Sequence, residues 1–249
     1  MKWILLALFV VSASFAQAPN LNVPTQAQME DILADFAGNM VHSTATGAHS
    51  ATLVSFEIGV VGGVIDTPNL ALQDPNVDKI GNGALYATLE LPLGIGGEML
   101  YSPVKTDDLD YDYKSFAAFW SVPGLSFSLK LKGFATNATI KFIEPSSSAN
   151  VNYESSGYGA NITFGKKLLF VEPYLGVGYV SSNNKLTTSV AGSISGVGTV
   201  EASAAAGLDL DDTYIFAGLD VDLIFLSLGF EYSKPYGNDR YIGRVALGF

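Results

Sequence analysis

The two histidines, His42 and His49, are the residues of this sequence best suited to acid–base chemistry. Each is followed directly by a serine, Ser43 or Ser50, in a connector rich in serine and threonine. A histidine that contacts a serine hydroxyl can act as a general base and make it a nucleophile. The sequence contains no other histidine and no cysteine, so a hydrolytic site would have to use this connector.

Two clusters of aspartates could instead bind a divalent cation. They comprise Asp107, Asp108, Asp110 and Asp112 in one stretch and Asp209, Asp211 and Asp212 in another. Carboxylates at alternate positions can bind Ca²⁺, but neither cluster has the glycine-punctuated loop of an EF-hand. We therefore predict solvated loop charge, with no metal site and no cofactor.

The composition points to a protein with one face in lipid. Of 249 residues, 48% are hydrophobic and only 15% are charged, whereas soluble domains usually carry about 25% charged residues. Beyond the N-terminus no stretch approaches the ~20 apolar residues of a transmembrane helix. This excludes a helical membrane protein and favours a β-rich one, and the net charge of −11 argues against a nucleic-acid partner.

The N-terminus has the pattern of a secretory signal peptide. Lys2 precedes an apolar run from Trp3 to Val11, and the small residues Ser14 and Ala16 lie at −3 and −1 of a cleavage site before Gln17. We predict that residues 1–16 are removed after export. The mature chain then divides into an N-terminal segment, 17–50, and a strand-rich domain, 51–249.

One helix is expected, over residues 26–40. Its apolar residues recur at helical spacing and form one face; they are Met29, Ile32, Leu33, Phe36, Ala37 and Met40.

From Ala51 onward the apolar period changes to two, as in a half-buried strand. Val54, Phe56 and Ile58, for example, alternate with Ser55 and Glu57. The predicted strands are 51–64, 82–92, 95–104, 111–121, 125–143, 150–165, 168–185, 210–223, 225–235 and 240–249. The fifth could be two strands broken near Gly133, and the Ser/Ala/Gly-rich stretch 187–207 could hide a hairpin, so the range is eight to twelve.

Short and long connections alternate along the chain. The short ones lie near Pro92, Pro123 and Gly165, and the long polar ones cover 66–82, 105–110, 144–150, 185–210 and 235–239. Short turns at one end and long loops at the other are typical of outer-membrane barrels. We therefore predict an all-β, antiparallel transmembrane β-barrel of about ten strands in the Gram-negative cell outer membrane.

The last strand carries a resemblance to a known superfamily. Tyr241, Val245, Leu247 and Phe249 alternate on one face. In this respect the sequence resembles bacterial outer-membrane β-barrel proteins, whose final strand ends in Phe after alternating apolar residues. The resemblance implies that the barrel-assembly machinery reads these residues, with outer-membrane lipid and lipopolysaccharide as further partners.

Charged residues on the faces opposite the apolar ones should line the barrel lumen, because the bilayer core penalises charge. These candidates are Glu57, Glu90, Glu98, Lys130, Lys132, Glu172, Asp220, Asp222, Glu231 and Arg244. Their mixed signs suit either ion pairs that close a narrow barrel or the lining of a wet pore.

The helix is expected to plug the lumen or to cap its periplasmic mouth. A helix followed by a barrel is loosely similar in layout to the long-chain fatty-acid transporter family, whose N-terminal plug gates uptake. We expect a channel or transporter for a small solute that could be hydrophobic. The alternative is a structural or surface-interaction barrel with a sealed lumen, acting through loops 66–81 and 186–209. No enzyme is expected, since outer-membrane lipases and deacylases carry the serine two positions after the histidine.

Overall fold

The computed structural model describes residues 26–50, 53–72, 77–106, 109–144, 149–194 and 198–248. Within these ranges the strands form one closed antiparallel barrel, in which each strand pairs with its sequence neighbours and the first pairs with the last. The predicted fold class and the count of ten strands are confirmed. The signal peptide, the remainder up to residue 25 and the terminal Phe249 lie outside the described residues.

The elements follow the predicted order. They are α2 (Gln26–Asn39), β1 (Ser55–Asp66), α3 (Pro68–Ala71), β2 (Lys79–Glu90), η1 (Pro92–Gly94), β3 (Ile95–Lys105), β4 (Leu109–Ser121), β5 (Ser128–Glu144), β6 (Ala149–Gly165), β7 (Val171–Ile194), β8 (Gly198–Leu223), β9 (Leu226–Ser233), η2 (Pro235–Gly237) and β10 (Arg240–Gly248). The region predicted as 125–143 forms a single strand, β5. The one-turn helix α3 was not expected from the sequence.

Side chains alternate between the inside and the outside of the barrel. In β4, Ser115 and Phe119 are buried, whereas Phe116 is 57% exposed and Trp120 is 45% exposed on the outer face. In β10, Tyr241, Val245 and Leu247 of the predicted assembly signal also point outward and are 41–51% exposed. A closed barrel with an apolar outer face leaves no unpaired backbone within its closed wall and can sit in hydrocarbon.

No helix among the described residues is long and apolar enough to cross a membrane.

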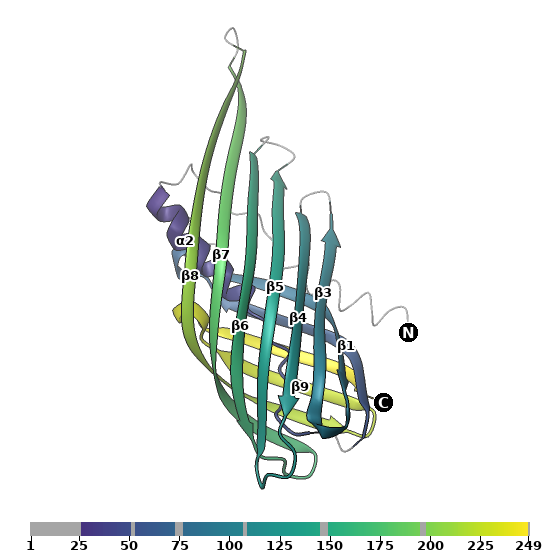
Figure 1. Ribbon diagram of the computed structural model, residues 1–249. Helices are drawn as coiled ribbons and strands as arrows, with labels where there is room; N and C mark the ends of the chain where they lie inside the picture. The colour runs from purple at the N-terminus through teal and green to yellow at the C-terminus, as the bar shows by residue number, and fades with distance from the viewer. Residues whose placement is uncertain are drawn as a thin grey trace.

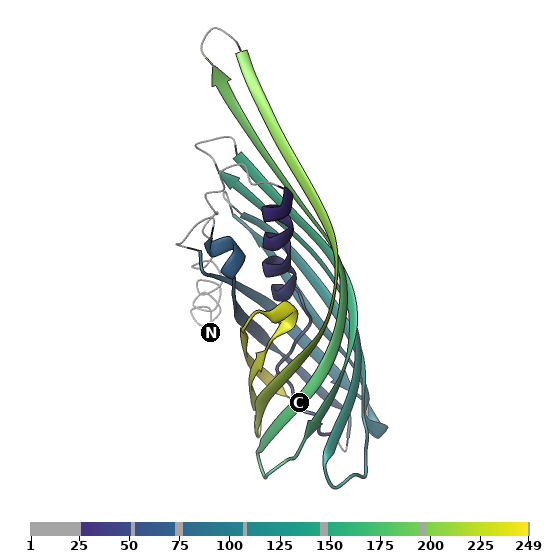
Figure 2. The same cartoon turned by 90° about the vertical axis from the view of Figure 1, so that its left-hand side faces the viewer.

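The barrel wall is much taller on one side than on the other. β7 has 24 residues and β8 has 26, whereas about 9–11 residues suffice to span a bilayer. Figures 1 and 2 show these two strands rising beyond the rest of the wall, and their pairing continues to Ile194 and Gly198.

The prediction of a loop over 185–210 is therefore wrong, and so is the twelve-strand alternative. The stretch continues the β7–β8 hairpin, and β6 also pairs with β7 as far as Val190. Pairing between β7 and β8 holds these small, polar residues in strands that their local pattern would not indicate.

The N-terminal helix lies inside the barrel, at the end away from the C-terminus. α2 contacts the inner faces of β7 and β8, together with α3 and η2, which connect β1 to β2 and β9 to β10 (Figure 2). From its end at Asn39, residues 40–50 run through the lumen toward the start of β1. We call residues 26–50 the inner segment. The alternative prediction, that the helix caps the mouth of the barrel where β1 begins, is wrong, because α2 lies at the opposite end.

The apolar face of α2 packs against the tall wall. Met29, Ile32, Leu33, Phe36 and Met40 are each at most 2% exposed. The Phe36 ring stacks on Tyr153 with ring centroids 5.0 Å apart. This cluster continues to Leu186 and Ala206 on β7 and β8, so the helix is held by hydrophobic contact with residues far apart in sequence.

Phe36→Ala tests this packing. Deleting a fully buried phenylalanine should lower the free energy of unfolding by about 3–5 kcal/mol, measured by reversible urea unfolding in lipid vesicles. Leu72→Ala is the control, because Leu72 is 80% exposed and its truncation should change the free energy by less than about 0.5 kcal/mol. Equal effects of the two substitutions would contradict the packing of α2.

Candidate functional site

The helical end of the inner segment is held by groups from the barrel rim. The Asp35 carboxylate accepts hydrogen bonds from the backbone N–H of Asn69 (2.9 Å) and Leu70 (2.8 Å) in α3. Burial raises the pKa of Asp35, and these hydrogen bonds oppose that change. Arg240 donates from Nη1 to the carbonyl oxygens of Gly38 (3.1 Å) and Val41 (2.7 Å). A cation suits this position, because the helix C-terminus carries partial negative charge.

The middle of the inner segment is held by a buried charge network. His42 has its Nδ1 2.8 Å from Ser115 Oγ and its Nε2 3.0 Å from Glu98 Oε2. Lys132 Nζ lies 2.7 Å from the same Glu98 oxygen, and Thr44 donates to it at 2.9 Å. Burial lowers the pKa of His42, with the positive charge of Lys132 acting in the same direction. The positive charge of Lys132 compensates the negative charge of Glu98.

Ser115, His42 and Glu98 have the residue types of a hydrolase triad, but their surroundings do not suit catalysis. Ser115 is completely buried, and its hydroxyl also donates to the carbonyl oxygen of Ala135 at 3.1 Å. The cavity lined by His42 measures about 10 Å³, roughly the space that one water needs. With Ser115 inaccessible to any lipid, the three residues attach the inner segment to β3 and β4.

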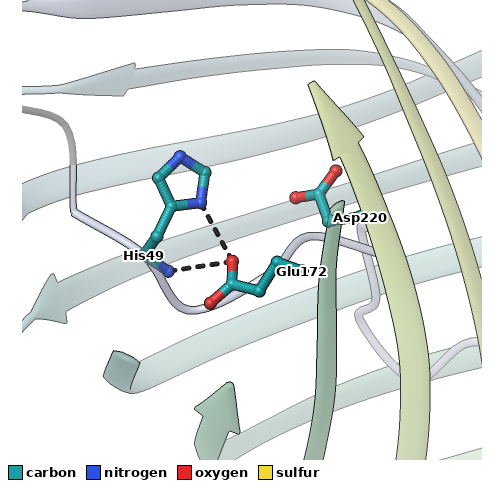
Figure 3. Close-up of side chains that lie close together, drawn as sticks. All are labelled: His49, Glu172 and Asp220. Carbon is teal, nitrogen blue, oxygen red and sulfur yellow. Dashed lines mark hydrogen bonds and ion pairs between the residues drawn. The ribbon is translucent and has the colours of Figure 1, made fainter. Parts of the chain in front are cut away.

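The lower end of the inner segment meets a second network. Arg244 donates to Glu57 (2.5 Å) and Asp220 (2.6 Å), and Asp220 also accepts the backbone N–H of Gly47 at 2.7 Å. His49 lies against Glu172, with both its backbone N–H (3.1 Å) and its Nδ1 (2.9 Å) directed to Oε2 (Figure 3).

The predicted lumen residues lie largely where the alternation placed them. Glu90, Glu98, Lys130, Lys132, Glu172, Asp220, Glu231 and Arg244 are all buried. The side chains of Glu57 and Asp222 are 18% and 28% exposed. Rather than lining an open path, most of them contact the inner segment or one another; Glu231, for example, accepts a hydrogen bond from Ser43 at 2.6 Å. Their role in passing a solute stays a prediction.

Three residues of these networks, Arg240, Ser115 and Asp35, are not among the site residues predicted from the sequence. Arg240 shares the inward parity of Ile242 and Arg244 on the last strand, so the alternation could have identified it. Ser115 and Asp35 carry no such signal, because their partners come from distant segments that only the closed barrel brings together.

Two small cavities lie inside the barrel among the residues that the structure describes. A cavity of about 20 Å³ lies between Val41, Tyr111, Tyr113 and Arg240, and the one beside His42 is smaller. Both are of the size of a single water molecule. The inner segment fills the lumen where these cavities lie.

A closed antiparallel barrel with an apolar exterior and charged side chains in its interior defines the class. The chain is an integral β-barrel of the outer-membrane type. In such barrels the short turns lie on the periplasmic side and the longer loops outside the cell. Because β7 and β8 extend beyond the rest of the wall at the end where α2 lies, we expect that end on the extracellular side.

No protein-family model and no curated protein matches the sequence. Similar solved structures are barrels of low sequence identity. The translocator domain of autotransporter NalP from Neisseria meningitidis has 13% identity and a TM-score of 0.38, over 81% of this chain and 90% of that one. Ail, the attachment invasion locus protein of Yersinia pestis, has 13% identity and a TM-score of 0.32, over 79% and 97%. The toluene transporter TodX of Pseudomonas putida has 8% identity and a TM-score of 0.32, over 92% and 98%.

A double-mutant cycle tests the buried pair of Glu98 and Lys132. Lys132→Met should lower the free energy of unfolding by about 3–5 kcal/mol, because it leaves Glu98 buried without its cation. Adding Glu98→Gln should recover much of this loss. Urea unfolding measures all four corners of the cycle, and strictly additive single effects would show that the pair is not coupled.

The free energy of unfolding should fall as the pH falls below about 6.5. The pKa of His42 is lowered in the folded protein, so the unfolded chain takes up this proton first and acid favours unfolding. One such group contributes at most about 1.4 kcal/mol per pH unit. Urea unfolding between pH 8 and pH 5 should show this slope in the wild type and a smaller one in His42→Gln. An identical slope in both proteins would contradict the assignment.

Proposed function

We propose that this protein is a surface-interaction barrel: a lumen sealed by the inner segment, and a binding surface on the extracellular β7–β8 hairpin. The observation that carries the proposal is the combination of an inner segment bonded to the lumen wall with a hairpin whose strands are more than twice as long as the membrane requires. Both features favour action outside the membrane over passage through it.

Sealing is supported by the attachments of the inner segment at three depths. Arg240 and the α3 amides hold its helical end, Glu98 holds its middle, and Asp220 and Glu172 hold its lower end. Gly229 lets it approach β9 closely, since a Cβ built there would lie 2.1 Å from the carbonyl oxygen of Ala45. Opening a solute path would require all these contacts to break together.

The hairpin offers a strand edge on one side. β9 pairs with β8 only between Phe216 and Leu223, so among the described strands none pairs with that edge over residues 198–215. In the connection from β9 to β10, the backbone N–H groups of Lys234 and Tyr236 donate to β8 near the lower part of this edge, at Ile215 and Asp212. An uncovered strand edge can add an extended segment of another chain by backbone hydrogen bonding.

The charge on this part of β8 favours a basic partner. Asp209 and Asp211 are exposed, and their described hydrogen-bond partners are the neutral side chains of Asn183 and Tyr179. A partner segment that alternates lysine or arginine with apolar residues would match both the edge and these carboxylates.

Transport of a small solute is the second candidate. The mixed charges that hold residues 40–50 favour this candidate, because water could hydrate those charges once the inner segment was released. It would require an open state with the inner segment displaced from β9.

Conductance of planar bilayers distinguishes the two candidates. The wild-type barrel should conduct no more than protein-free bilayers, whereas Gly229→Val should conduct, because its side chain displaces the chain at Ala45. Gly243→Val is the matched control on β10, since a Cβ at Gly243 meets no atom within 4 Å. Sustained conductance by the wild type would contradict the sealed lumen and favour transport.

Peptide binding tests the extracellular surface. A fluorescent octapeptide of alternating lysine and valine should bind the wild-type barrel in nanodiscs and bind Asp209→Asn/Asp211→Asn at least about tenfold more weakly. Asp110→Asn/Asp112→Asn removes the same charge from β4 and should bind as the wild type does. Equal binding by all three, or none by the wild type, would contradict a basic partner at β8.

A further inference from the structure

We propose that His49, Glu172 and Asp220 form a binding site for a divalent transition-metal ion of the zinc class, which links the lower end of the inner segment to the barrel wall. This site is independent of the hairpin surface, and it needs the inner segment in its docked position, because His49 belongs to that segment. It lies at the end of the barrel where β1 and β7 begin and β8 ends.

The three side chains converge from separate parts of the chain (Figure 3). One ligand atom of each, the His49 nitrogen and one oxygen from each carboxylate, lies within 4.8 Å of the other two. Glu172 and Asp220 are directly opposed in the β7–β8 register and are 1% and 4% exposed. Like charges directly opposite on paired strands repel each other, so a cation between the two carboxylates would reduce their electrostatic repulsion.

The charge balance of the lower network also points to a cation. Its carboxylates are Glu57, Glu172, Asp220 and Asp222, and its cations are Arg244 and Lys167. Four negative charges against two positive ones leave two uncompensated, which is the charge of one divalent ion.

The carboxylate of Glu172 has the capacity to bind such an ion. Glu172 has no lysine or arginine ion pair among the described residues, and the side chain that contacts its Oε2 is that of His49. Its second oxygen, Oε1, is buried and accepts no well-formed hydrogen bond, so it is available as an additional ligand. Gly47 keeps the approach open, since a Cβ built there would lie 2.0 Å from Oε2.

Asp222 lies where a carboxylate would orient the histidine. Its Oδ2 is 3.4 Å from His49 Nε2, so an Nε2–H directed at Asp222 leaves the Nδ1 lone pair facing Glu172 and Asp220. Metal-binding histidines usually donate their other ring N–H to a carboxylate in this way. Lys167 contacts the same carboxylate, and its Nζ lies 3.1 Å from His49 Nε2. Without a metal ion, Lys167 can therefore donate to Nε2, and Nδ1 can carry the ring proton.

The donor set selects the class of ion. One imidazole nitrogen with two carboxylates suits Zn²⁺, whereas Ca²⁺ and Mg²⁺ take oxygen ligands. The remaining coordination position is open to Glu172 Oε1 or to water.

Isothermal titration with Zn²⁺ of the untagged, full-length mature barrel in detergent tests the proposal. The wild type should bind one Zn²⁺ per chain, and His49→Ala and Glu172→Gln should each lose that binding. Asp222→Asn should bind about 10–100-fold more weakly, as expected for a residue that orients a ligand. His42→Gln is the matched control, because it removes the other histidine of the inner segment and should keep wild-type affinity.

Co²⁺ provides a second readout that does not depend on stability. The wild type should develop visible ligand-field absorption with Co²⁺ that His49→Ala lacks, and retained urea stability of the variants shows that they are folded. Absence of Zn²⁺ binding by the wild type, or equal binding by the wild type and His49→Ala, would overturn the site. Either result would leave the conductance and peptide experiments unaffected.

Discussion

The charges that face the interior of this narrow barrel need partners, and the inner segment supplies many of them. Glu98, Glu172, Asp220 and Glu231 are nearly inaccessible to solvent, and an unpaired buried charge costs several kcal/mol. Residues 42–49 meet these carboxylates with hydroxyls, imidazoles and backbone N–H groups. The wall and the inner segment therefore depend on each other, because removing the inner segment would expose acids that the few lysines and arginines of the wall do not balance.

The same requirement explains how the two halves of the inner segment differ. Its helical half is apolar and packs on the tall wall through Phe36 and its neighbours. Its extended half is polar and follows the charged lumen below. The uneven wall gives the helix a hydrophobic surface at the end of the barrel where β7 and β8 continue as a long hairpin. This arrangement supports a function at the cell surface.

Much of the fold could be predicted from residue alternation. The period of two placed Glu98, Lys132 and Arg244 on the inner face, and Tyr241, Val245 and Leu247 on the outer, because a strand has only two faces. The helical spacing of Met29 to Met40 identified α2 within one residue of its end. The stretch 185–210 was mistaken for a loop, since its small polar residues are strands only through pairing with their neighbours. The contacts of His42 with Ser115 and of His49 with Glu172 join segments more than 70 residues apart, and no local pattern encodes them.

Native-state hydrogen exchange at Gly47 and His49 tests the central claim, that the inner segment is docked in the lumen. Their backbone N–H groups donate to Asp220 and Glu172, so NMR of the barrel in lipid should find them protected about as strongly as amides of the barrel strands. Exchange of both amides at the rate of an unstructured peptide would contradict the account, because residues 40–50 would then not be held against the wall.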